Sequence, residues 1–132
     1  MAIATKDKNN GRQWPLVARQ PFDFSQLEDG VAVEAIELPV GAIVLSGSIV
    51  VTEAFDSGTS DALAVSGGGV TSAAFADAQT PGIAPAVVTG AEQTLGDTVD
   101  ITWSPVGTAA TAGAGYLEVM YIITSRANEN QP

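Results

Sequence analysis

Apolar and polar residues alternate with a period of two along much of this chain, which is the pattern of half-buried β-strands. The alternation is clearest in residues 43–52, 98–103 and 116–124. Weaker alternation predicts further strands at 16–24, 31–38, 61–66, 70–76 and 84–89. In each of the three clear strands we expect one apolar row to face the core: Ile43, Leu45, Ile49 and Val51; Val99, Ile101 and Trp103; Leu117, Val119, Tyr121 and Ile123.

Two segments depart from simple alternation. In residues 31–38 the pattern breaks near Ala35, which either a β-bulge or one helical turn would explain. Residues 24–30, FSQLEDG, are the best helical candidate in the chain, with Ser25 as the cap of a single turn that Gly30 ends.

Glycine and proline recur at short intervals from residue 30 onward and leave no room for a long amphipathic helix. Residues 67–97 are rich in Gly, Ala, Thr and Pro, and they predict long loops with one or two strands. About eight short strands with turn-rich connections predict an all-β domain, which is a sandwich, a jelly roll or a small barrel. The boundaries that we predict are an extended N-terminal arm at 1–15, the β domain at 16–125 and a polar C-terminal tail at 126–132.

Charge is divided unevenly along the chain. Residues 1–19 hold four of the five basic side chains and have a balance of +3, whereas residues 20–132 have a balance of −13, which gives the net charge of −10. Because the arm is too polar to fold alone, we expect it to become ordered on another copy of the protein or on a larger acidic assembly. Trp14, beside Pro15, is expected to anchor it. The residues that we expect to contact a partner are Lys6, Lys8, Arg12, Trp14, Arg19 and Arg126.

The chain contains no histidine and no cysteine. This composition excludes disulfides, Ser-His-Asp triads, Cys-His pairs and zinc sites of the usual ligand type, so we predict no enzyme activity and no cofactor. An acidic body repels phosphates, and we therefore expect no nucleic acid as a partner. No apolar run approaches the length of about 18 residues that a membrane span needs, and no apolar signal segment follows the first lysines. These features predict a soluble protein that is made in the cytoplasm of the producing cell.

The densest group of carboxylates lies in residues 53–61. Asp56 and Asp61, with three hydroxyl side chains around Gly58, offer the hard oxygen ligands that Ca²⁺ binds, although the spacing is not that of an EF-hand. The alternative, which we favour, is a β-connection in which these side chains bond their own backbone. A glycosidase would need a carboxylate pair across a cleft that aromatic side chains line, and two Trp, two Tyr and four Phe are few for that purpose.

Three segments contain recognisable motifs. They are KNNGRQWPLVA at 8–18, VEAIELPVGAIVLSGSIVVTEAFDSGTSD at 33–61 and AGAGYLEVMYIITSRANENQ at 112–131. The segments cover about half of the chain and leave out residues 67–97. Their N-N-G-R…P start, V-V-T-E-A-F-(N/D)-S-x-T-S-D core and Y-x-x-x-x-R-A-N-E end resemble those of small virion structural proteins of tailed bacteriophages.

This resemblance implies a head decoration or capsid cement protein, a class in which jelly-roll folds are common. We accordingly predict a single jelly-roll-like β-sandwich with an extended N-terminal arm, which binds the outside of the head shell and bridges capsid subunits without enzyme activity. The implied partners are the phage major capsid protein and further copies of the chain, as a dimer or a trimer. One alternative is another virion part, such as a head fibre or a tail component. The other is a carbohydrate- or host-surface-binding β module, which exposed aromatic side chains in a concave site would favour.

Overall fold

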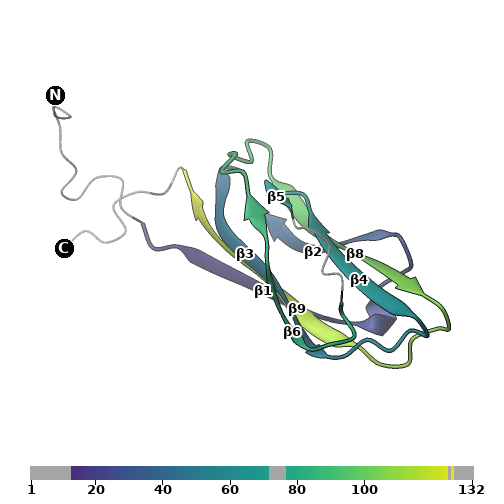
Figure 1. The fold of residues 1–132 in the computed structure, drawn as a ribbon. Helices are drawn as coiled ribbons and strands as arrows, with labels where there is room; N and C mark the ends of the chain where they lie inside the picture. Colours follow the sequence, from purple (N-terminus) through teal and green to yellow (C-terminus); the bar gives the residue numbers. More distant parts are fainter. Residues whose placement is uncertain (1–12, 72–76, 125, 127–132) are drawn as a thin grey trace, which may run out of the picture.

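The computed structural model of the protein describes residues 13–71, 77–124 and 126. These residues form β-strands and one short 3₁₀ turn, without an α-helix among them (Figure 1). The strands are β1 (Leu16–Asp23), β2 (Ala32–Leu38), β3 (Ala42–Glu53), β4 (Ser60–Ser66), β5 (Val70–Thr71), β6 (Gly82–Pro85), β7 (Val87–Val88), β8 (Asp97–Val106) and β9 (Ala114–Ile123), and the 3₁₀ turn is Phe24–Gln26.

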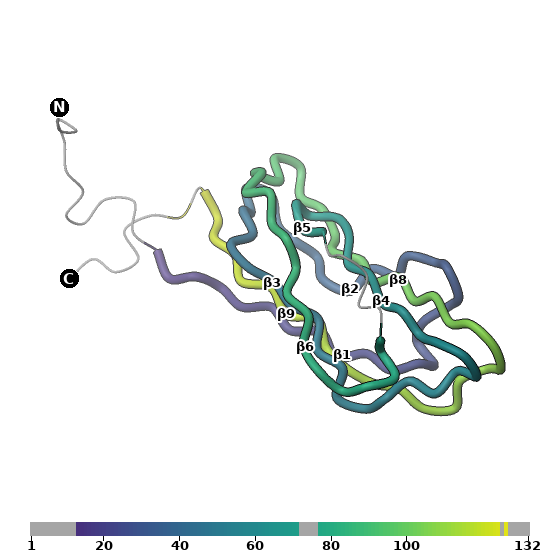
Figure 2. The backbone as a smooth tube through the Cα atoms, viewed as in Figure 1, coloured from purple at the N-terminus to yellow at the C-terminus, as the bar shows by residue number. Residues whose placement is uncertain are grey.

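The strands pair antiparallel in two main layers (Figures 1 and 2). One sheet has the order β1-β9-β3-β6 and the other has the order β2-β8-β4, while β5 and β7 pair in a small ribbon beside them. In chain order β1, β2, β3, β4, β6, β8 and β9 therefore alternate between the two sheets, and the first and last strands are neighbours. This interleaved order is that of a jelly roll. The prediction of an all-β jelly-roll-like sandwich is confirmed.

The core lies between the two sheets. The predicted inward rows of β8 and β9 are confirmed, since Val99, Ile101, Leu117 and Val119 are at most 1% exposed and Trp103 is 7% exposed. Farther along β9, Tyr121 is only partly buried against the core, and Ile123 is half-buried outside the core cluster. The inclusion of Ile123 in the core row was wrong, because β9 ends there and no buried residue of the other sheet packs on it.

The predicted inward row of β3 is half correct. Ile49 and Val51 are buried, but Leu45 is 43% exposed and Val44 is 2% exposed. The pairing of β3 with β9 shifts between Val44 and Ser46, and a shift of one residue moves every side chain to the opposite face. The assignment of Ile43 and Leu45 to the core was therefore wrong.

Two smaller expectations have different outcomes. The break near Ala35 in β2 is a register shift of the bulge type, between Glu34 and Ile36, so the first of the two explanations is correct and the helical turn is not. The turn after β1 is a 3₁₀ turn, but Ser25 does not cap it and Gly30 does not end it. The Asp23 side chain accepts from the Ser25 N–H at 2.9 Å, and the turn closes at Leu27. Asp23 takes the cap position because its carboxylate reaches the free amides at the start of the turn.

The described part of residues 67–97 contains three short strands, β5, β6 and β7, where one or two were predicted. The first two residues of the expected strand at 70–76 form β5 (Val70–Thr71), and residues 72–76 lie outside the described residues. The expected strand at 84–89 is split into β6 and β7. Ala86 lies between the two and donates its N–H to the Gly47 carbonyl at 2.8 Å.

Candidate interaction surfaces

One glutamine side chain ties the start of β1 to the end of β9. The Gln13 side-chain amide donates to the carbonyls of Ile123 at 2.8 Å and Arg126 at 2.9 Å. Its carbonyl oxygen accepts from the Ile123 N–H at 2.9 Å. Because β1 and β9 are neighbours, the described chain enters and leaves the sandwich at the same end of one sheet (Figure 1).

The structure separates the residues that we predicted to contact a partner. Lys6, Lys8 and Arg12 lie outside the described residues. Trp14 is 62% exposed and follows Gln13, and Arg126 lies beside the same glutamine. Trp14 and Arg126 therefore belong to one end of the molecule.

Arg19 lies elsewhere, in the middle of β1. Its guanidinium donates to Glu118 Oε2 through Nε at 2.9 Å and through Nη2 at 2.7 Å. It also lies over the Tyr116 ring, 4.1 Å from the ring centroid. Arg19 thus belongs to the outer surface of a sheet and already has an acidic partner within the chain.

The outer surface of the β1-β9-β3-β6 sheet, which we name the four-strand face, is more apolar than a solvated sheet surface. Antiparallel sheets with one side in water usually carry polar residues on that side. Here one apolar row crosses all four strands, and in register it consists of Pro21, Tyr116, Val50 and Ile83. A second apolar group lies nearer to the chain ends and comprises Val17, Met120, Ile122, Ile43 and Leu45.

Between these two apolar groups runs a row of mixed character. It consists of Arg19, Glu118, Ser48 and Pro85. Its two charges form the ion pair described above, so they cancel. The four-strand face is therefore apolar on both sides of an electrically neutral centre.

The outer surface of the β2-β8-β4 sheet, which we name the three-strand face, has the opposite character. One row consists of Glu34, Asp100 and Ser66, and the next consists of Ala32, Thr102 and Ala64. The carboxylates of Glu34 and Asp100 are directly opposite each other, an arrangement that like charges disfavour. This surface is small-residue and acidic, without a large apolar side chain in either row.

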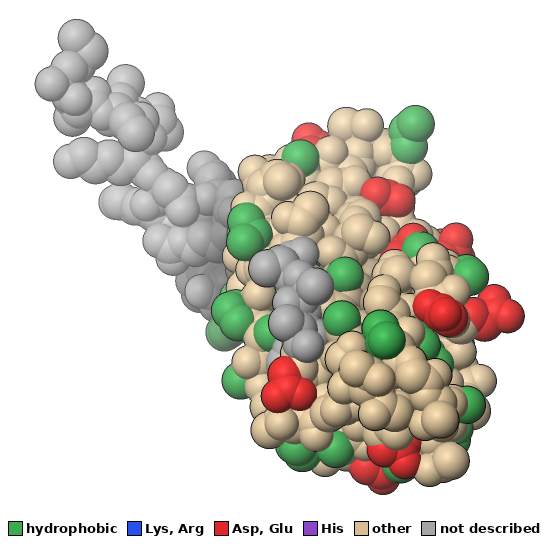
Figure 3. Space-filling model, turned by 45° about the vertical axis from the view of Figure 1, so that its right-hand side comes forward, with side chains coloured by type: hydrophobic (Ala, Val, Ile, Leu, Met, Phe, Trp, Pro, Cys, Tyr) green, Lys and Arg blue, Asp and Glu red, His purple; other side chains and the backbone are tan. Residues whose placement is uncertain are grey.

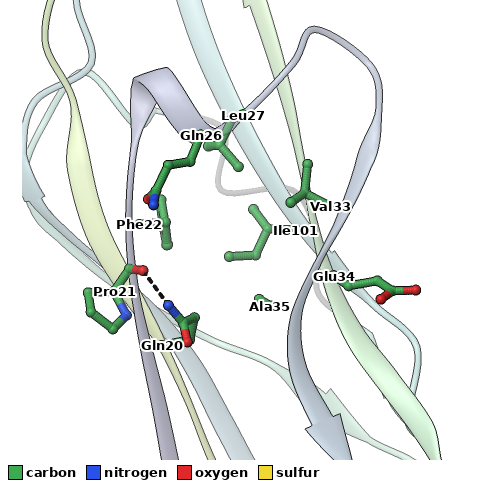
Figure 4. Close-up of a pocket in the computed structure, with 9 residues that line it drawn as sticks. All are labelled: Gln20, Pro21, Phe22, Gln26, Leu27, Val33, Glu34, Ala35 and Ile101. Atoms are coloured by element: carbon green, nitrogen blue, oxygen red, sulfur yellow. Dashed lines mark hydrogen bonds between the residues drawn. The ribbon is translucent and has the colours of Figure 1, made fainter.

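A cleft of about 260 Å³ opens between β1 and β2, the edge strands of the two sheets (Figure 4). Its apolar floor includes Phe22, Leu27 and Ile101, each at most 7% exposed. Gln20 and Glu34 supply polar groups, and the Glu34 side chain points away from the other lining residues (Figure 4). Phe22 is the one aromatic residue in the lining, and it is buried. The cleft therefore lacks the exposed aromatic platform of a carbohydrate site.

The carboxylates of the 53–61 loop bond to protein donors. Asp61 is fully buried and accepts from the Ser57 N–H at 3.0 Å and the Ser57 hydroxyl at 2.7 Å. Asp56 accepts from the N–H and the hydroxyl of Thr111, both at 2.6 Å, and from the Ala112 N–H at 2.9 Å. The hydrogen bonds of Thr111 lower the pKa of Asp56 below its ordinary value. Asp61 therefore bonds the backbone of its own connection, as the favoured interpretation expects, whereas Asp56 fastens this connection to a different loop.

Two further searches give negative results within the described part of the chain. No group of three or more His, Cys, Asp or Glu side chains there is arranged to hold a metal ion. Across residues 13–71, 77–124 and 126, no helix has the length and apolar character needed to cross a membrane.

Comparison with known proteins finds similarity at the level of the fold. No protein-family model matches the chain, and no curated protein matches it. A chain of the cyanophage Pam1 capsid asymmetric unit superposes with a TM-score of 0.61 and 22% sequence identity, over 93% of this chain and 93% of that one. A chain of the capsid of Ralstonia phage GP4 superposes with a TM-score of 0.53 and 18% identity, over 81% of this chain and 84% of that one. The chain therefore shares its fold with phage capsid chains.

Sequence reasoning missed two features of these surfaces. The Gln13 contacts have no sequence signal, because one amide in a polar segment is indistinguishable from its neighbours. The four-strand face did have a signal. In residues 116–123 of β9 both the odd-numbered and the even-numbered residues are apolar, except for Glu118. The core of the sandwich buries only one apolar side of such a strand, so the other side is open to a further contact.

Proposed function

We propose that the protein is a structural component of a tailed-bacteriophage virion, and that it decorates the outside of the head shell and stabilises it by bridging capsid subunits. The observation that carries this proposal is the shared jelly-roll fold over 93% of both this chain and the cyanophage Pam1 capsid chain. The sequence resemblance to small virion structural proteins supports it independently, since that likeness rests on motifs and not on the fold.

The architecture suits a bridging role. A two-layer β-sandwich is a rigid body, and both chain ends leave it at the end that Gln13 fastens. Residues 1–12 would span about 40 Å when extended, which is enough to reach a neighbouring subunit. Repetition over a symmetric lattice makes individually weak contacts collectively strong.

Charge gives the arm its role in this proposal. Lys6, Lys8 and Arg12 precede a body in which carboxylates greatly outnumber basic groups. Opposite charge accelerates association, and apolar contacts then hold the complex. In the proposed complex the basic arm meets an acidic surface of the shell or of a neighbouring copy, and the exposed Trp14 ring is an apolar anchor.

The experiment uses heads of the phage whose genome encodes the chain, prepared with and without the gene. Cryo-electron microscopy of both preparations should show additional density of sandwich shape on the outer surface when the protein is present. Heads without the protein should release DNA at a lower temperature, and addition of the purified protein should restore the higher release temperature. Density in the tail or at the base of a fibre would instead identify the alternative virion parts, and absence from the particle would refute the proposal.

A further inference from the structure

We propose that two copies of the protein associate face to face through the four-strand face, the outer surface of β1-β9-β3-β6. This inference does not depend on attachment to a capsid. It rests on the charge, the apolar rows and the symmetry of this one surface.

Charge restricts where two copies can meet. The chain has fifteen carboxylates and five basic side chains. On the face shown in Figure 3 the described part of the molecule presents red carboxylates and no blue basic side chain. Two such bodies repel each other in most orientations. The central row of the four-strand face differs, because the charges of Arg19 and Glu118 cancel there in an ion pair with 2.7 Å between Nη2 and Oε2. A second copy can therefore approach this surface without bringing uncompensated carboxylates together.

The same surface is unusually rich in apolar groups. Ile83 is 68% exposed at one edge of the sheet, and Val17 is 62% exposed at the opposite edge. Leu45 is 43% exposed between them. Apolar residues that are contiguous across four strands, as in the row from Pro21 to Ile83, mark an interaction surface more often than a solvated one.

The sheet order makes the surface self-complementary. A two-fold axis that runs parallel to the strands, between β9 and β3, places β1 of one copy opposite β6 of the other, and β9 opposite β3. The apolar row then lies on the same row of the second copy, with Tyr116 against Val50. In the central row Glu118 lies against Ser48, so like charges do not face each other. Isologous pairing of this kind is the commonest symmetry of homo-oligomers.

Engineered cysteines test this geometry directly, because the natural chain contains none. Pro21 and Ile83 lie on the first and fourth strands of one row, about 14 Å apart at 4.8 Å per strand. Facing sheets pack about 10 Å apart, so the side chains of facing cysteines in two copies point toward each other and a short bis-thiol linker such as dibromobimane can join them. The same linker cannot span the distance between the two cysteines of one copy, so P21C/I83C can cross-link only between copies. The matched control, A32C/A64C, occupies the two edge strands of the three-strand face.

With this linker at about 50 μM protein, where contacts of micromolar affinity are populated, P21C/I83C should convert mainly to covalent dimers. A32C/A64C should stay mainly monomeric. Equal cross-linking of the two variants, or none in either, would overturn the proposal.

Sedimentation velocity provides a second test that needs no cross-linking. Ile83→Lys places two ammonium groups in the apolar row of a symmetric dimer, and it should weaken association about tenfold or more. Ala64→Lys changes the net charge equally but lies on the three-strand face, so its dissociation constant should match that of the natural chain. The natural chain should also associate more strongly at high salt, because screening reduces repulsion between acidic bodies. A natural chain that stays monomeric at 100 μM, or a dimer that Ile83→Lys leaves unchanged, would refute the proposal. Head attachment is scored separately, so the failure of one proposal does not imply the failure of the other.

Discussion

Replacement of Trp103 by phenylalanine separates the two roles of this side chain. The indole is 7% exposed, and its ring lies 5.6 Å from the Phe55 ring. Its Nε1 donates to Asp61 Oδ1 at 2.8 Å. Ser57 and the Gln79 side-chain amide supply the other donors to this fully buried carboxylate. Phenylalanine keeps the aromatic contact but removes the indole donor.

The expected cost follows from the lost hydrogen bond. A hydrogen bond to a charged group contributes about 1.5–3 kcal/mol, and a buried acceptor that loses its donor cannot turn to water. Trp103→Phe should therefore lower the free energy of unfolding by about 2–3 kcal/mol. Trp103→Ala loses the ring as well, which alone costs about 3–5 kcal/mol. Because domains of this size have total stabilities of about 5–15 kcal/mol, the alanine variant should be close to unfolding.

Urea unfolding at pH 7, followed by far-ultraviolet circular dichroism, measures these differences. Trp14→Phe is the matched control, and a change of about 0.5 kcal/mol or less is expected at that exposed position. In an Asp61→Ala background, Trp103→Phe should cost at least 1 kcal/mol less than in the natural chain, since neighbours that share a bond are not additive. Equal costs in the two backgrounds, or a Trp103→Phe variant as stable as the control, would refute the hydrogen-bond role.

Three further predictions concern the arm, a strand contact and a loop. Deletion of residues 1–12 keeps the Gln13 contacts and should leave the melting temperature unchanged while it abolishes co-sedimentation with heads; full attachment of the truncated protein would contradict the role of the arm. Gly115→Ala should lower the free energy of unfolding in urea by about 1–3 kcal/mol, because the added Cβ would clash with the Val50 carbonyl oxygen on the neighbouring strand; an unchanged unfolding midpoint would show that β3 and β9 can move apart to accept the methyl group. The pKa of Asp56 is lowered in the folded state, so its hydrogen bonds stabilise the fold above pH about 4 and this contribution disappears as the pH falls through the folded-state pKa. Asp56→Asn should therefore melt below the natural chain at pH 7, and the difference should narrow as the pH falls below about 4. A difference in melting temperature that is constant with pH would exclude this linkage.

Much of the fold could be predicted because a period of two fixes which residues share a face. In β8 the polar residues Thr98, Asp100 and Thr102 alternate with buried apolar ones. Only the apolar side of this strand can therefore face the core. The prediction failed in β3, where Ile43, Val44 and Leu45 are consecutive apolar residues. Either the odd-numbered residues Ile43 and Leu45 or the even-numbered Val44 could be buried there. The register shift that decides between them depends on the pairing of β3 with β9.

The candidate surfaces could be predicted less well, because they depend on strand order. Charge counting separates a basic N-terminal segment from an acidic body, but it groups Arg19 with the arm. Only the pairing of β1 with β9 places Arg19 opposite Glu118, within a sheet. The cap by Asp23 was missed for a similar reason, since Asp23 and Ser25 are both good cap residues and the end of β1 decides which of them precedes the turn.

The contrast between β8 and β9 shows what the sequence implies once the sheet order is known. Both are ten-residue strands, and the central residues of their inward rows are buried. The outward residues of β8 are polar from Thr98 to Ser104, as is usual for a surface in water, whereas the outward residues of β9 include Tyr116, Met120 and Ile122. A two-layer sandwich needs only one apolar side per strand, so folding does not explain the second apolar side of β9. Its neighbours β1, β3 and β6 present apolar residues in the same rows, and this coincidence across four strands is what association of two sheet surfaces requires.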